Sequence, residues 1–492
     1  MKRQKVYTKG QASSKPWLFN ANIITVFGVS DCVLEFNINL GLPRMTRIAF
    51  YELSKLSYDQ RSVLLTRPEN DLDLFLERVK PVIEDVRIKG DAALVKYAAK
   101  FDKAHFRASE IKASETEVEE AFDLLDRDVI EALEYGANNI RRFHEDQLPD
   151  EMQMKEVRPG IFTGERHTPI DSAAIYSPRG KGSFPSVTLM AAIPAVVAGV
   201  KDPIILTPAG SDGKIDPATL VAARLSGVDR VYKAGGAVAV AAAAFGTETV
   251  PKCIKIEGPG SPWLVAAKRL LTDKITSRLP AGPSDSIIFA DQTVNPRLAA
   301  MDLLIESEHG TDSSAFLVTT SREVAEGTIA ALPDFWATMG EPWVEHSSAV
   351  LSGENGGVIL ADDLQQAYDF INDYAPEHCQ VLSDEPFEHL RHIHNAAEVL
   401  LGNWTPGTLA NYVLGPNCVL PTGAHAKVHS PLGVYDFMKS GTVAHVSRSG
   451  FDEAAPFAQL LAKYEGFDGH ANAVSNLREQ LICPPINGKV VL

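Results

Sequence analysis

The chain has 492 residues, which is enough for two or three domains with sizeable cores. Hydrophobic residues make up 45% of it, and 63 acidic against 47 basic side chains give a formal net charge of −16. This balance is typical of an acidic globular protein, and it argues against nucleic acid or an anionic membrane as a partner.

Residues 1–45 differ in composition from the rest. The first fifteen carry five basic side chains and no acidic one, and 19–42 is apolar without a clear period. An organellar targeting peptide is one interpretation, but such peptides favour arginine and an amphipathic helix. We therefore predict that 1–45 is an N-terminal extension and that the protein is cytoplasmic. Organellar targeting by this segment is the alternative.

The next hundred residues are predicted to be mainly helical. Apolar residues at helical spacing indicate a helix over 70–86 that Gly90 ends. Asp91 is expected to cap a second helix, through Phe101. Ser114 and Glu117 form a capping box ahead of a third.

Short apolar runs then alternate with helical stretches, which indicates a parallel sheet with right-handed crossovers. The expected strands are 173–176, 203–206, 230–232 and 253–256. The expected helices, two of them strongly apolar, are 187–199, 217–225 and 237–245. None of them is as long as the run of about 20 apolar residues that a membrane-spanning helix needs. We predict a Rossmann-like domain with its ligand crevice beyond the carboxyl ends of the strands.

A second series follows, with expected strands 286–290, 314–318 and 358–360 and helices 297–306 and 363–373. Beyond residue 419 loops prevail, before a helical tail at 455–464. The predicted fold class is α/β, with two Rossmann-like parallel-sheet domains, a helical N-terminal segment and a small C-terminal tail domain. The predicted boundaries are 46–174 plus 284–432 for the first domain, 175–283 for the second, and 433–492 for a dimerisation tail.

Glycine-rich turns follow two of the strands, at 233–237 and 258–261. Their backbone amides could meet a phosphate at a helix N-terminus, although neither turn has the G-x-G-x-x-G pattern, and plain tight turns are the alternative. Ser284, in the turn 281–285, is either a ligand donor or a turn residue. The five cysteines are scattered and odd in number, which fits a reducing compartment. They include no CxxC pair, which argues against a thiolate zinc site.

Adjacent Glu377 and His378 combine a carboxylate that can prepare a water for attack with an imidazole that can take a proton. Glu306 and His309 lie three apart at a helix end, a spacing that suits two metal ligands or a solvated terminus. Asn411 and the pair Glu465 and His470 lie on separate loops. Singly each has an ordinary structural explanation, but together these residue types could build a metal site.

In their order and spacing these segments resemble the histidinol dehydrogenase family. The resemblance covers about residues 50 to 480 and is carried by 176–180 (YSPRG), 235–237 (GGA), 245–252 (FGTETVPK), 258–260 (GPG), 281–284 (AGPS), 308–310 (EHG), 375–378 (APEH), 419–422 (VLPT) and 430–432 (SPL).

This resemblance implies a zinc-dependent homodimer that oxidises a primary alcohol, through an aldehyde, to a carboxylate with two NAD+. His378 would take the alcohol proton, and Glu377 would activate the water that adds to the aldehyde. The implied metal ligands are Glu306, His309, Asn411 and His470, the last from the second subunit. The implied contacts of substrate are Ser284 and Glu465, and Tyr176 is an implied contact of NAD.

Several positions depart from the family pattern. Glu306 stands where the family has Gln, and Asn411 where it has Asp, so the charge of the ligand set is unchanged and we predict that a divalent metal still binds. Cys418 replaces a family His, which makes it a candidate for contacting substrate or metal. Val238 and Ser261 replace a Gln and an Asn associated with NAD contact.

These departures leave the substrate open. It is either L-histidinol, as in histidine biosynthesis, or another polar alcohol such as a sulfonated propanediol. A metal-binding pseudoenzyme with a structural role is a third hypothesis, against which the intact pair Glu377 and His378 argues.

Overall fold

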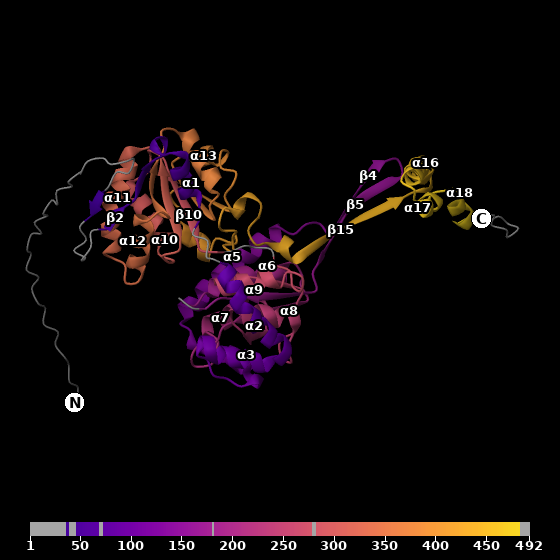
Figure 1. The fold of residues 1–492 in the computed structure, drawn as a ribbon, viewed down its shortest axis with the longest axis horizontal. Coiled ribbons are helices and arrows are strands. Elements are labelled where there is room, and N and C mark those ends of the chain that lie inside the picture. The colour runs from indigo at the N-terminus through magenta and orange to yellow at the C-terminus, as the bar shows by residue number, and fades with distance from the viewer. Residues whose placement is uncertain (1–35, 39–45, 68–71, 180–181, 278–281, 483–492) are drawn as a thin grey trace, which may run out of the picture.

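The computed structural model describes residues 36–38, 46–67, 72–179, 182–277 and 282–482. Two α/β lobes lie against each other, and an antiparallel arm projects from them to a group of small C-terminal helices (Figure 1). None of the helices in these ranges is long and apolar enough to cross a membrane.

The larger lobe contains a six-stranded sheet, parallel throughout, in the order β14-β13-β10-β11-β12-β3. Its strands are β3 (Phe50–Glu52), β10 (Asp285–Ala290), β11 (Ser314–Thr319), β12 (Gly356–Leu360), β13 (His378–Leu382) and β14 (Glu398–Leu401). One face packs on α10 (Pro296–Ser307), α11 (Arg322–Trp336) and α12 (Trp343–Ser352). The other face packs on α1 (Tyr58–Leu65) and α13 (Leu364–Tyr374).

Successive side chains of β13 point alternately to the two faces of the sheet. Cys379 and Val381 belong to the core on the α13 side. Because successive side chains of a strand point to opposite faces, His378 and Gln380 face α10. Gln380 accordingly donates a 2.6 Å hydrogen bond to Asp302 of α10.

The smaller lobe contains a parallel sheet in the order β8-β7-β6-β9. Its strands are β6 (Ser172–Tyr176), β7 (Asp202–Thr207), β8 (Val231–Lys233) and β9 (Lys255–Glu257). Its crossover helices are α6 (Pro185–Val197), α7 (Pro217–Ser226), α8 (Gly236–Phe245) and α9 (Pro262–Leu270). The predicted Rossmann-like sheet is confirmed, with the last strand starting two residues later than expected.

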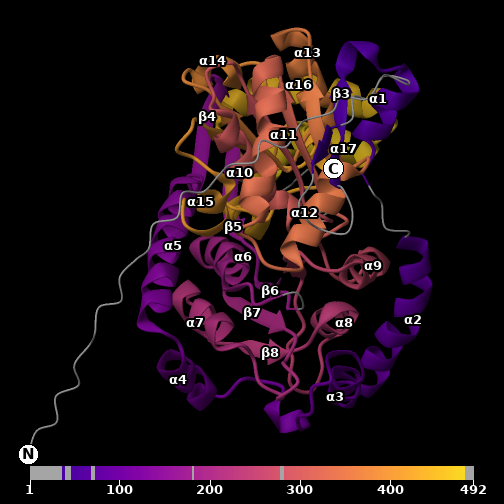
Figure 2. The same ribbon diagram turned by 90° about the vertical axis from the view of Figure 1, so that its left-hand side faces the viewer.

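The N-terminal helices complete this smaller lobe. They are α2 (Leu72–Lys89), α3 (Asp91–Tyr97), α4 (Glu115–Leu124) and α5 (Arg127–Asp146). The first two share a core with α8 and α9, and the last two share one with α6 and α7 (Figure 2). The packing therefore differs from the predicted boundaries, which grouped 46–174 with the larger sheet. An amphipathic pattern specifies that a helix buries one face but not which sheet receives it.

The predicted start of α3 is also corrected. Gly90, at φ +51°, is the residue that precedes the helix, and Asp91 is its first residue. The Asp91 carboxylate instead accepts hydrogen bonds from Thr247 Oγ1 at 2.6 Å and from Thr249 N at 3.2 Å. Asp91 therefore makes tertiary hydrogen bonds in place of the capping hydrogen bond that the sequence predicted. The capping box of Ser114 and Glu117 is confirmed.

The arm is a three-stranded antiparallel sheet that the sequence did not predict. It consists of β4 (Met152–Arg158), β5 (Ile161–Pro169) and β15 (Met438–Val446). It leads to α16 (Arg448–Tyr464), α17 (Asp468–Ala473) and α18 (Asn476–Ile482). Since β15 pairs with β5, the predicted tail 433–492 is joined to the chain upstream by a shared sheet.

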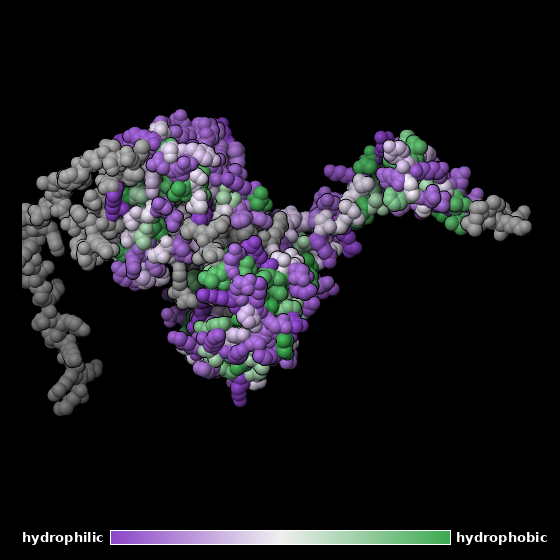
Figure 3. Space-filling model, in the orientation of Figure 1, coloured by the Kyte–Doolittle hydropathy of each residue, from purple (hydrophilic) through white to green (hydrophobic). Residues whose placement is uncertain are grey.

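The helical end of the arm buries little of its own apolar surface. Its buried hydrophobic residues are small ones, such as Ala455, Ala462 and Ala471. On α16, Phe457 is 69% exposed and Tyr464 is 91% exposed. Figure 3 shows hydrophobic residues at the surface of this end. An exposed apolar surface of this kind is typical of a site of association.

The remaining strands and α-helices of the described residues are β1 (Phe36–Ile38), β2 (Thr46–Ile48), α14 (Pro386–Leu390) and α15 (Gly407–Tyr412). β1 and β2 pair antiparallel. The predicted extension 1–45 otherwise lies outside the described residues, so neither interpretation of it is decided.

Candidate active site

The predicted catalytic residues lie at the amino edge of the larger sheet. His378 opens β13, and Glu377 directly precedes it. The segment 417–423 connects this edge with the smaller lobe: Asn417 donates a 2.5 Å hydrogen bond to Met190 O of α6, and Gly423 N donates one of 2.8 Å to Asp285. The site therefore lies where the two lobes meet.

His378 is oriented by a carboxylate that sequence reasoning missed. Its Nδ1 lies 2.8 Å from Oε2 of Glu398, and both side chains are buried. The opposite ring nitrogen, Nε2, lies 3.9 Å from Oε1 of Glu377. Burial opposes protonation, but the carboxylates of Glu306, Glu377 and Glu398 outweigh it and raise the pKa of His378 to about 10. The predicted role of His378 assumed the ordinary pKa of an imidazole. In this environment the pKa is higher.

Glu377 is held by Asp285, the first residue of β10. The backbone N–H of Glu377 donates to Asp285 Oδ1 at 2.7 Å, and the N–H of Asp285 donates to Glu377 Oε2 at 3.2 Å. Burial, together with the negative charges of Asp285 and Glu306, raises the pKa of Glu377 to about 8. A carboxyl group tuned in this way is a stronger base than an exposed one.

Asp285 is itself fixed by an arginine from far upstream. Arg67 Nε donates to Asp285 Oδ2 at 3.2 Å, and its Nη2 donates to Tyr374 O at 2.6 Å. The guanidinium lies 3.2 Å from the centroid of the Tyr374 ring. These contacts tie the Glu377 loop to the segment that follows α1.

Three of the four predicted metal ligands lie together. Oε2 of Glu306, near the end of α10, is 2.9 Å from Nδ1 of His309. Asn411, on α15, donates a 2.9 Å hydrogen bond from Nδ2 to Oε1 of Glu306. His470 lies on α17, at the end of the arm and away from this cluster within one chain (Figure 1).

The donor set suits a divalent cation. Glu306 is buried, and its Oε2 faces Nδ1 of His309 at 2.9 Å. Burial acts against it, yet the imidazoles of His309 and His378 lower the pKa of Glu306 to about 2, so the group is anionic. A carboxylate oxygen beside an imidazole nitrogen fits zinc. No cluster of three or more His, Cys, Asp or Glu side chains with metal-binding geometry occurs within the described part of a single chain.

Of the predicted substrate contacts, Ser284 and Cys418 lie near the metal-ligand candidates, whereas Glu465 lies on the arm. Ser284 Oγ lies 3.3 Å from Nδ1 of His309. The N–H of Cys418 donates to Met190 Sδ at 3.3 Å, and burial and the nearby carboxylates raise the pKa of the thiol well above its usual value. Cys418 is thus a neutral thiol near the carboxylates. Glu465 is exposed at the end of α16, on the arm.

The predicted NAD contacts lie at the carboxyl end of the smaller sheet. The hydroxyl of Tyr176, at the end of β6, accepts a 3.0 Å hydrogen bond from Gly236 N, and burial raises its pKa to about 12. Val238 is buried in the first turn of α8, and Ser261 precedes α9. Gly258 is at φ +122°, and a Cβ there would come 2.1 Å from Tyr176 O, so this turn requires glycine.

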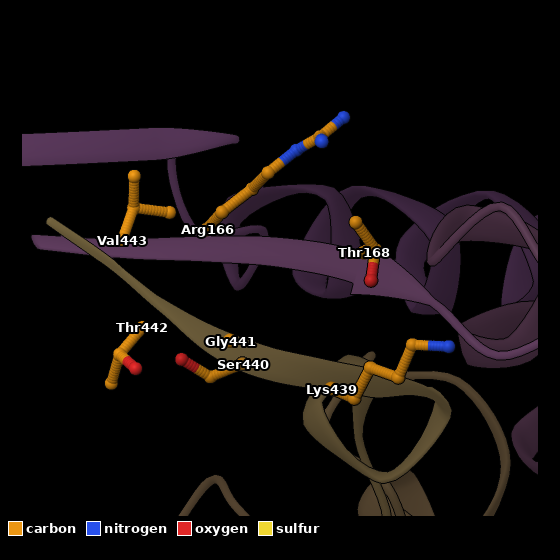
Figure 4. A pocket seen from close by; sticks show the side chains of 7 residues that line it. All are labelled: Arg166, Thr168, Lys439, Ser440, Gly441, Thr442 and Val443. Atoms are coloured by element: carbon orange, nitrogen blue, oxygen red, sulfur yellow. The ribbon is translucent and has the colours of Figure 1, made fainter. Parts of the chain in front are cut away.

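A surface hollow of about 320 Å³ lies elsewhere, along β5 and β15 of the arm (Figure 4). It is lined by Arg166, Thr168, Lys439, Ser440, Gly441, Thr442 and Val443. None of the candidate residues lines it, so it has no part in the site described above.

Three functional candidates were missed from sequence, namely Glu398, Asp285 and Arg67. The first two share a signal, because each is a charged residue that opens a mostly apolar strand, as His378 also does. Polar residues at the first positions of buried parallel strands gather at one edge of the sheet. Arg67 carries no comparable signal.

Comparison with known proteins agrees with this architecture of two α/β lobes. The crystal structure of histidinol dehydrogenase from Elizabethkingia anophelis superposes with a TM-score of 0.83 at 32% identity, covering 88% of this chain and 99% of that one. A sequence profile described as histidinol dehydrogenase matches residues 65–478.

Two relatives illustrate the similarity. A protein named "Histidinol dehydrogenase homolog" from Colwellia psychrerythraea is 55% identical over 89% of this chain and 98% of its own length. A protein named "Histidinol dehydrogenase" from a Synechocystis strain is 46% identical over 89% of this chain and 100% of its own length. The chain belongs to the histidinol dehydrogenase family, a family of oxidoreductases, and the resemblance seen in the sequence is confirmed.

Proposed function

We propose that this protein is an NAD-dependent, metal-assisted dehydrogenase that oxidises a primary alcohol, through the aldehyde, to a carboxylate with two NAD+. The observation that supports this most directly is the buried pair Glu377 and His378, beside the cluster of Glu306, His309 and Asn411. Each catalytic side chain has a fixed partner, so the pair is positioned before substrate arrives.

His378 takes the proton of the alcohol oxygen. Its Nδ1 is committed to Glu398, so Nε2 is the nitrogen that accepts. Among the carboxylates, Glu306 contributes most to the raised pKa of His378. When bound, zinc would offset that charge, polarise the substrate oxygen and hold the reacting carbon toward the nicotinamide that accepts the hydride.

Glu377 serves the second oxidation. Its carboxylate removes a proton from the water that adds to the aldehyde carbon, giving a hydrated aldehyde whose carbon then loses the second hydride. The hydrogen bonds with Asp285 hold the carboxylate in place. The raised pKa of Glu377 strengthens it as a base near neutral pH.

We propose that the working unit is a homodimer in which the arm of each subunit completes the site of the other with His470 and Glu465. Both residues are exposed on the helical end of the arm, and neither lies near Glu306 in its own chain (Figure 1). The exposed apolar face of α16 supports this arrangement, since association would bury side chains such as Phe457 and Tyr464.

L-histidinol is one candidate substrate. Another polar primary alcohol, such as a sulfonated propanediol, is a second. The second is favoured by the neutral thiol of Cys418, where the family has a histidine, and by similarity to proteins named histidinol dehydrogenase homologs at 53–56% identity. A protein named histidinol dehydrogenase is 46% identical.

A panel of NADH-formation assays tests the proposal. The purified protein is given L-histidinol, other amino alcohols and sulfonated propanediols, each with and without a chelator. Turnover of histidinol selects the first substrate, and turnover of another alcohol alone selects the second. No NADH with any alcohol, although metal is bound, would favour a structural pseudoenzyme and contradict the proposal.

A further inference from the structure

The smaller sheet has the strand order of half a dinucleotide-binding fold. Counted along the chain, β6, β7, β8 and β9 are strands 1 to 4, and they lie in the order 3-2-1-4. In such folds an acidic residue about 20 residues beyond the glycine-rich turn binds the ribose hydroxyls of NAD. Here β7 is followed by Pro208, Ala209 and Gly210, and the first carboxylate after them, Asp212, accepts a 3.0 Å hydrogen bond from Lys214 N.

Asp102 brings a carboxylate to this place from outside the sheet. It ends a single turn of π-helix, η2 (Ala98–Asp102), and the chain around it packs on Ala209 through Ala98 and Ala104. A Cβ built on Gly235 would lie 3.3 Å from Oδ2 of Asp102 and 3.0 Å from Cγ of Pro208. The carboxylate therefore lies against the turn between β8 and α8, next to the end of β7.

The Asp102 carboxylate accepts no hydrogen bond from the described residues, although it is partly buried. Burial raises its pKa to about 6, while the charge of Arg179 acts in the opposite direction. Neither of its oxygens is among the fully buried side-chain atoms without a partner, so both are open to a donor from solvent or from a ligand. Its surroundings include Tyr176 and the Gly235–Gly236 turn, on the side of the sheet where NAD is expected.

We infer that Asp102 accepts hydrogen bonds from the adenosine ribose hydroxyls of NAD+ and selects NAD+ against NADP+. A 2′-phosphate at this position would meet a like charge and lose the hydroxyl that donates. The inference rests on the proposed use of NAD+, and it assigns the choice of cofactor to a residue that lies outside the sheet.

Binding of cofactor fragments tests this inference without turnover. Calorimetry of the full-length protein is carried out with ADP-ribose and with 2′-phospho-ADP-ribose. The wild type should prefer ADP-ribose, and Asp102→Asn and Asp102→Ser should each weaken its binding about 10- to 100-fold, as expected for loss of a charged hydrogen bond. Asp229→Asn, which changes a carboxylate ahead of the amino end of β8, is the matched control and should bind like the wild type.

Three results would overturn the inference: unchanged ADP-ribose affinity in two folded Asp102 variants, preference of the wild type for the 2′-phosphate, or an equal loss of affinity in Asp229→Asn. If the wild type still forms NADH from an alcohol, the proposed function survives that failure. If the wild type binds neither fragment and forms no NADH, both fail together. Thermal unfolding of each variant establishes that it is folded.

Discussion

His378 and Glu398 are the opening residues of two neighbouring strands, and they are paired in register across the sheet. Nδ1 of the imidazole lies 2.8 Å from Oε2 of the carboxylate. The pair thus fixes the ring and favours its protonated form, and both effects bear on a histidine that must accept a proton in each turnover.

Glu398→Gln should lower kcat by about 10- to 100-fold, since the amide removes the charge that orients and stabilises the imidazole. Because Glu398 raises the pKa of His378, its neutralisation should lower that pKa. The acidic limb of the kcat/KM profile, below which His378 is protonated, should therefore move to lower pH. Glu388→Gln, at an exposed position on α14, is the control. A lower kcat without movement of the limb would assign Glu398 a packing role only.

The two catalytic residues should separate the half-reactions. His378→Ala should reduce oxidation of the alcohol by at least about 100-fold, because general base catalysis at that step is lost. Glu377→Gln should leave the first hydride transfer largely intact and slow oxidation of added aldehyde. Stopped-flow NADH traces, started from the alcohol and from the aldehyde, measure both steps. Equal losses at both steps in both variants would contradict this division of roles.

Sequence reasoning predicted the strands of the two lobes better than it predicted the arm. Apolar runs of four or five residues identified β6, β7, β10 and β11, because burial on both faces leaves a continuous signal. The arm strand β15 gave no such signal, since most of its side chains are exposed and its partners in β5 lie 269 to 285 residues earlier in the chain.

The sequence also predicted only some of the residues of the candidate site. Glu377, His378, Glu306, His309 and Asn411 were identified from motifs, and the structure brings them together. Asp285 and Glu398 were missed because their role depends on which strands are neighbours, which the linear pattern does not give. The pKa of His378 could not be predicted either, since it depends on three carboxylates from separate segments.

Asp302 should make stability depend on pH. It is buried on α10, where burial raises its pKa from 3.8 to about 6 although Gln380 donates to it. A carboxyl group whose pKa is higher in the folded state stabilises most below its unfolded pKa, and this contribution is lost as pH rises through the folded value. Asp302→Asn should therefore gain stability relative to the wild type between about pH 4 and pH 6, by up to about 3 kcal/mol.

Urea unfolding of both proteins at several pH values measures this difference. Asp369→Asn, at an exposed position on α13, should show a difference from the wild type that does not change over the same range. A constant difference for Asp302→Asn would show that the carboxyl group has the same pKa in the folded and unfolded states.

Sharing of the site between subunits can be tested by complementation. His470→Ala and His378→Ala should each be nearly inactive alone. In a mixed dimer, the His470→Ala subunit keeps its own His378 and receives an intact His470 from the other chain, so one of the two sites is complete. Equal amounts, unfolded and refolded together, give mixed dimers as half of the population, so activity should recover to about a quarter of the wild-type value. The pair His378→Ala and Glu377→Gln is the control, because both changes lie in the same half of the site and a mixed dimer contains no complete one. Recovery in the control as well as in the test pair, or in neither, would mean that His470 does not act across a subunit boundary.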